Sequence, residues 1–96
     1  MRIEIKKERL FESERYKGVT VSYRVPKPAD IEEAVGKHTG TVLFDRCVLQ
    51  VYGLEDQDGV AMDKERILEN GPNPLIQEVA SDMLRHSMLK ETEKNV

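Results

Sequence analysis

The sequence has a single cysteine and no long uninterrupted run of apolar residues. Cys47 has no second cysteine for a disulfide, and its apolar setting predicts a small buried side chain and not a reactive thiol. Asp45 and Arg46 interrupt the most apolar stretch well short of the roughly 20 residues that a membrane span needs. The charged residues 1–9 do not resemble a signal peptide. We therefore expect a cytosolic protein that does not bind membranes.

The sequence also lacks an excess of positive charge. Its formal net charge of −3 argues against nucleic-acid binding, because neutralising phosphates requires clustered lysine and arginine. Residues 1–27 hold eight basic and four acidic side chains, whereas residues 28–96 hold seven basic and fourteen acidic ones. Two interpretations stay open: the two parts attract each other between copies, or the charges pair within one subunit or face water. For contact between copies the candidate residues are Arg24, Lys27, Asp56, Asp58 and Asp63.

Patterns typical of catalytic or metal-binding sites are missing as well. Aligning Gly59 with the obligatory glycine of an EF-hand loop puts Leu54, which cannot coordinate calcium, at the first ligand position. His38 and His86 have no further ligands at metal-binding spacing. No carboxylate pair lies in an apolar setting that would raise a pKa, and no glycine-rich phosphate loop is present. We predict no catalytic, cofactor or metal site, and hence no enzyme.

Residues 19–25 give the clearest strand, because β-branched and aromatic residues alternate there with polar ones. Pro26 ends this strand. Its antiparallel partner is expected in residues 3–5 or in residues 10–11, with the polar residues 12–18 as the turn. The pattern predicts a β-hairpin whose register stays open.

Residues 41–54 form the most apolar stretch of the chain. On a helix, Arg46, Gln50 and Gly53 make one narrow polar stripe, and apolar side chains cover the remaining surface. The valines would also suit a strand, but a half-buried strand alternates apolar and polar residues, which this stretch does not. It therefore predicts a buried central helix that starts near Thr41 and ends at Gly53.

Three further helices have recognisable start signals. Asp30 begins a short helix, Asp63 begins a second that ends at 70–72, and Asn73 with Pro74 begins the last. The expected fold is a single α+β domain over residues 1–90. It consists of an N-terminal antiparallel β-hairpin (1–27) and about four α-helices (28–90), followed by a frayed tail (91–96).

This order of features resembles the small tail assembly chaperones of long-tailed bacteriophages and prophages. The likeness runs from about residue 19 to residue 89 and lies in the layout. Its parts are the strand entering Tyr23–Asp30, the apolar helix over 43–54, the turn over 56–62 and the closing helix from Pro74. A structural baseplate or tail accessory protein, or a small regulatory protein-binding module, remains an alternative.

The resemblance implies a non-catalytic chaperone that binds the tape-measure protein in the bacterial host cytoplasm and is absent from the mature virion. It also implies self-assembly, and the tail tube protein is a further candidate partner. Met83, Met88 and Leu89 on the last helix are our candidates for contacting the client, because methionine side chains adapt to varied surfaces. Burial of the same helix face in the core is the alternative.

Overall fold

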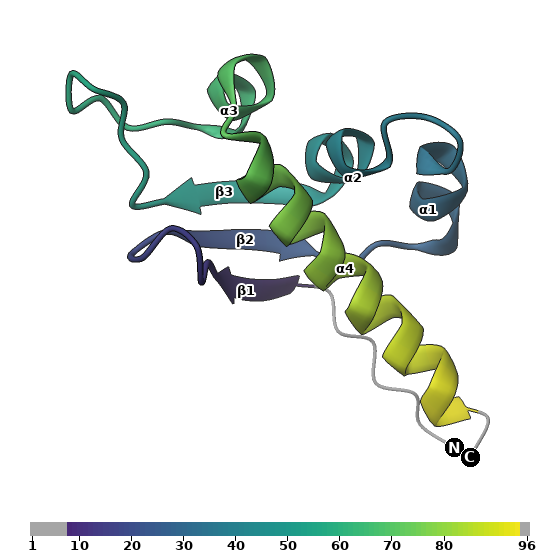
Figure 1. Cartoon of the computed structure of the whole chain (residues 1–96). Helices are drawn as coiled ribbons and strands as arrows, with labels where there is room; N and C mark the ends of the chain where they lie inside the picture. The colour runs from purple at the N-terminus through teal and green to yellow at the C-terminus, as the bar shows by residue number, and fades with distance from the viewer. Residues whose placement is uncertain (1–7, 95–96) are drawn as a thin grey trace.

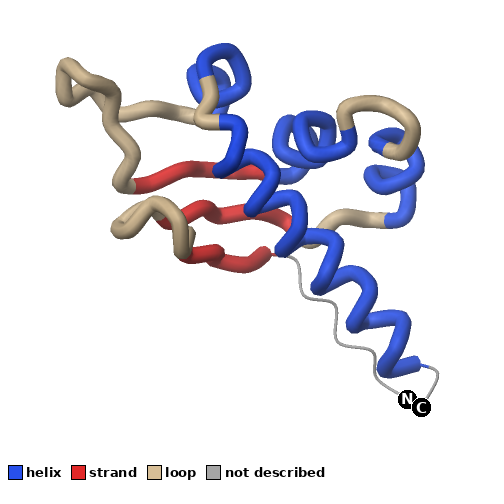
Figure 2. Tube along the Cα trace, viewed as in Figure 1, coloured by secondary structure: helices blue, strands red, loops and turns tan. Residues whose placement is uncertain are grey.

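The computed structural model describes residues 8–94, and the side chains of its last helix as far as Ser87. The order of elements is β1 (Glu8–Glu12), β2 (Thr20–Arg24), α1 (Pro28–Ala34), α2 (Thr39–Cys47), β3 (Val48–Tyr52), α3 (Lys64–Asn70) and α4 (Asn73–Lys94). This part of the chain contains one antiparallel sheet in the order β1-β2-β3 and four helices, so the α+β prediction is confirmed (Figures 1 and 2).

The β1–β2 hairpin matches the later of the two predicted partner segments. Leu10 pairs with Ser22, and Phe11 pairs with Val21. The turn that follows β1 closes through a hydrogen bond from the Ser13 backbone N–H to the Val19 carbonyl, at 3.0 Å. The other predicted partner, residues 3–5, lies outside the described residues.

The prediction of one central helix over 41–53 is wrong in its second half. The helix ends at Cys47, and β3 pairs antiparallel with β2, which makes β2 the middle strand. Ser22 lies opposite Gln50, whereas Tyr23 lies opposite Val48, so Leu49 is an extra residue at a β-bulge. Leu49 and Gln50 are consequently both exposed. The bulge removes the alternation by which the strand could have been recognised.

The hydrophobic core lies between one face of the sheet and the helices. Val21, Tyr23 and Val48 are buried on this face, and α2 and α4 cover it with their own apolar side chains. Burying each such side chain contributes about 1.5–3 kcal/mol to folding. The main contributions from the two helices come from Leu43, Phe44 and Cys47 of α2 and from Leu75, Ile76, Val79, Ala80 and Met83 of α4.

The helix ends follow local signals closely. The Asp63 side chain accepts a hydrogen bond from the Arg66 backbone N–H at 2.9 Å, which confirms it as the cap of α3. α1 begins at Pro28, earlier than predicted, because Lys27 is extended and proline suits the first helical position. α4 continues to Lys94, past residue 90, where the predicted helix ends.

Gly53 lies where the end of β3 meets the β1–β2 turn. Its φ is +83°, and a Cβ at this position would overlap the carbonyl oxygen of Gly18. Gly36 has a similar φ of +81°, but a Cβ there would have no atom within 4 Å. The two glycines thus share a backbone conformation and differ in the space around them.

We expect Gly53→Ala to destabilise the protein more than Gly36→Ala. Both substitutions cost about 1 kcal/mol because of the positive φ. Gly53→Ala should cost about 1–3 kcal/mol more, since the new methyl group forces two backbone segments apart. Urea unfolding of both variants measures the difference, and equal losses would show that the turn moves away without cost.

Candidate functional site

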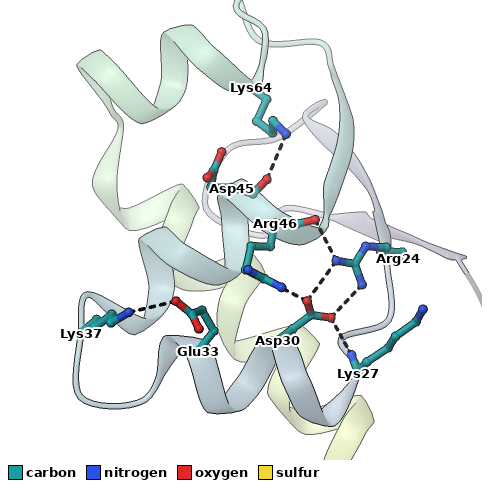
Figure 3. A network of polar contacts seen from close by, with 8 residues as sticks. All are labelled: Arg24, Lys27, Asp30, Glu33, Lys37, Asp45, Arg46 and Lys64. Carbon is teal, nitrogen blue, oxygen red and sulfur yellow. Dashed lines mark hydrogen bonds and ion pairs between the residues drawn. The ribbon is translucent and has the colours of Figure 1, made fainter.

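One polar cluster is centred on Asp30, at the start of α1 (Figure 3). Its carboxylate accepts hydrogen bonds from Arg24 Nη1 at 2.7 Å, Arg24 Nη2 at 3.1 Å and Arg46 Nε at 3.0 Å. The backbone N–H of Lys27 donates a further bond at 2.8 Å. Arg24 also donates to the Arg46 carbonyl oxygen at 3.1 Å. One carboxylate therefore joins β2, α1 and α2.

These contacts keep Asp30 ionised although the residue is only 3% exposed. The hydrogen bond from Arg24, the Lys27 N–H and the bond from Arg46 hold the pKa of Asp30 well below its usual range, against the opposing effect of burial. A carboxylate with such a low pKa and so many donors is a poor proton acceptor at neutral pH. Its evident role is to hold three elements together.

A second cluster fastens α4 to the hairpin. The Tyr23 hydroxyl donates to Asp82 Oδ2 at 2.6 Å, and Arg85 Nη2 lies 3.0 Å from Asp82 Oδ1. Burial, followed by the hydrogen bond to Asp82, raises the pKa of Tyr23. One turn earlier, Glu78 accepts a hydrogen bond from Ser13 Oγ at 2.6 Å. Glu78 and Asp82 together fix the position of α4 across the sheet.

The residues predicted for contact between copies fall into two groups. Arg24 is the last residue of β2 and Lys27 follows it, whereas residues 56–63 follow the end of the antiparallel strand β3. The two groups therefore lie at opposite ends of the sheet (Figure 1). Arg24 forms its ion pair with Asp30 inside the subunit. The side chains of Lys27 and Asp58 are exposed.

The acidic loop is organised by contacts within the chain. Asp56 accepts hydrogen bonds from the backbone N–H groups of Asp58 and Val60, at 2.9 and 3.0 Å. It also pairs with Arg66 at 2.7 Å, and this bond is the main reason that the pKa of Asp56 is lowered. Asp63 is occupied in capping α3. Of the acidic residues proposed for self-contact, Asp58 is therefore the most available.

The predicted client contacts on α4 have a different environment from the one expected. Met83 is 0% exposed and packs in the core, so in this conformation its side chain offers no binding surface. The helix face was identified correctly as apolar, but it packs within the same chain, against α2 and the sheet. The side chains of Met88 and Leu89 lie outside the description.

Apolar side chains are exposed on the strands instead. Leu10 is 69% exposed, Leu49 is 51% exposed and Tyr52 is 46% exposed. Leu10, Ser22 and Gln50 form one row across the sheet, and Glu12, Thr20 and Tyr52 form the next. We call these two rows, with Leu49 at the bulge, the open face. The sequence holds one signal for the open face, because the apolar Leu10 stands at an alternate position between Glu8 and Glu12. This spacing places Leu10 on the solvent face of a strand, and it could be interpreted only once β1 was known.

The described residues offer few side chains that could bind a cofactor or a metal ion. Cys47 is buried, and burial raises the pKa of its thiol. In the described part of the chain, no group of three or more His, Cys, Asp or Glu side chains could hold a metal ion. Over the same residues, no helix is both long and apolar enough to cross a membrane.

No protein-family model, curated protein or solved structure matches the chain.

We expect Asp30→Asn to destabilise the protein by about 2 kcal/mol at neutral pH, because the amide cannot pair with two guanidinium groups. The loss is smaller than for a fully buried pair, since the side chains of Arg24 and Arg46 are 32% and 42% exposed. Glu33→Gln, which removes an exposed pair with Lys37, is the control and should cost much less. Urea unfolding measures both.

The contribution of Asp30 to the stability of the fold should decrease as the pH falls. The pKa of Asp30 is lowered by folding, so the unfolded chain binds a proton more readily than the folded one. Its stabilising effect is complete above the unfolded pKa of about 4 and is lost as the pH falls below it. The stability difference between wild type and Asp30→Asn should therefore narrow in acid, and a constant difference would contradict this assignment.

Proposed function

We propose that the protein is a non-catalytic binding protein that covers apolar segments of a partner. Specifically, we propose a phage or prophage tail assembly chaperone that acts on the tape-measure protein in the bacterial cytoplasm. The observation that supports this most directly is the open face, where Leu10, Leu49 and Tyr52 are exposed on a sheet whose other face is buried. Grouped exposed apolar side chains are typical of protein interaction sites.

The chemistry of the open face suits weak and reversible binding. Full burial of one apolar side chain contributes about 1.5–3 kcal/mol, whereas association costs about 4–15 kcal/mol in lost freedom of motion. The open face has three exposed apolar side chains, interspersed with Ser22 and Gln50. The free energy gained by burying them therefore exceeds the cost of association by little or not at all. Many copies along a long client would bind it through repeated weak contacts, and tube assembly could displace them.

The rigid support of the sheet favours the same proposal. Asp30 fixes the end of β2, and Glu78 fixes the turn between β1 and β2. The open face is thereby ordered before a partner arrives, which lowers the entropy cost of binding. The separation of Lys27 from Asp58 at opposite ends of the sheet is compatible with head-to-tail contact between copies, which remains part of the proposal.

The layout that resembles the tail assembly chaperones is retained in part. The strand that leads into 26–30, the turn over 56–62 and the long closing helix are present in the order expected. The apolar segment over 43–54 is divided between α2 and β3. This resemblance is the reason for naming the tape-measure protein as the client.

The proposal is tested by affinity pull-down of the tagged protein from cells in which its prophage has been induced. We expect mass spectrometry to identify the tape-measure protein together with untagged copies of the chain. The double variant Leu10→Asp/Leu49→Asp should recover at least about tenfold less client, because charges on the open face oppose burial. Val35→Asp is the control for a single new charge away from the open face, since Val35 is similarly exposed but lies at the end of α1.

Each outcome of this experiment has a clear interpretation. Recovery of baseplate proteins would replace the chaperone by a structural tail component, and a single partner unrelated to tails would indicate a regulatory module. Equal recovery of client by the double variant and by Val35→Asp would exclude the open face as the contact. Thermal unfolding of the purified variants establishes that reduced recovery is not caused by misfolding.

A further inference from the structure

The strand β1 lies at an edge of the sheet. In the described part of the chain it pairs only with β2, so its other side presents backbone N–H and C=O groups along Glu8–Glu12. Such an edge can accept an additional strand through main-chain hydrogen bonds. Its central residue, Leu10, is 69% exposed. Within the described residues, the edge is therefore open along its backbone, and the Leu10 side chain beside it is exposed.

The side chains of β1 determine which strand could pair with this edge. Glu8, Leu10 and Glu12 are exposed and share one face, because side chains alternate along a strand. If β1 paired antiparallel with β1 of a second copy around Leu10, each Glu8 would lie opposite a Glu12. Like charges directly opposite one another destabilise a strand pair. The two glutamates thus disfavour this pairing between copies.

We propose that the β1 edge binds an extended segment of a partner protein in which two basic residues flank an apolar one at alternate positions. Paired antiparallel, the segment places its apolar side chain opposite Leu10 and its basic side chains opposite Glu8 and Glu12. It becomes the fourth strand of the sheet. Main-chain hydrogen bonds supply binding, and the two opposite-charge pairs supply selectivity.

The edge is held in place before the partner binds. Ser13, which directly follows β1, donates to Glu78 of α4, and the backbone N–H of Glu14 donates to the same carboxylate at 3.0 Å. Phe11, on the opposite side of the strand from Leu10, packs against the core. An incoming strand therefore meets a fixed template. This inference concerns the backbone edge of β1, which shares Leu10 and Glu12 with the open face, and it does not rest on the proposed function.

The test uses two synthetic peptides of about ten residues, a length typical of a long strand. One contains Lys-Thr-Val-Thr-Lys at its centre, and the other contains Glu-Thr-Val-Thr-Glu. Each is titrated into the ¹⁵N-labelled full chain at low salt and followed by NMR. We expect shifts at residues 8–12 and about tenfold tighter binding of the lysine peptide, from the two charge pairs.

Charge reversal provides the decisive comparison. Glu8→Lys/Glu12→Lys should invert the preference, whereas Glu32→Lys/Glu69→Lys makes the same change in net charge on exposed helix positions and should preserve it. Peaks of the unperturbed residues report that each variant is folded. Equal binding of both peptides, or no shift at 8–12, would overturn the proposal. Shifts at 8–12 that depend on protein concentration alone would assign the edge to a second copy instead.

Discussion

The arrangement of this protein depends on one buried carboxylate. Asp30 can remain ionised inside the fold only because two guanidinium groups and a backbone N–H surround it. Satisfying it fixes the end of β2 against α1 and the last turn of α2. Since β3 follows α2 without a connecting loop, the same contact determines where the third strand begins. Asp30 thereby fixes the positions of β2, β3, α1 and α2 relative to one another.

The second constraint is the position of α4, and it decides which surfaces are left for partners. Apolar residues of α4 bury one face of the sheet, while Glu78 and Asp82 bind the hairpin through Ser13 and Tyr23. The helix that the sequence suggested for client binding is thus used within the fold. Among the described residues, the other face of the sheet and the β1 edge stay exposed, which is why both binding proposals concern the strands.

Each of these surfaces offers a partner only a small number of contacts. The open face offers a few apolar side chains, and the β1 edge offers a backbone template between two carboxylates. The exposed Lys27 and Asp58 lie at opposite ends of the sheet. None has the burial or the charge density of a tight single site. A protein that binds many segments of a client and then releases them would use surfaces of this kind.

The sequence by itself determined the features that depend on near neighbours. The β2 strand, the cap at Asp63 and the break at 70–72 follow from alternation, hydrogen-bonding side chains and proline, all of which act within a few residues. It also identified the apolar face of α4, although Met83 on that face is buried and not available for the predicted client contact. Tertiary structure alone decided that Val48–Tyr52 is a strand, that Asp30 binds Arg46 and that Leu10 is exposed. These outcomes depend on a bulge, on ion pairs and on packing between segments that are distant in the chain, and no local pattern encodes such contacts.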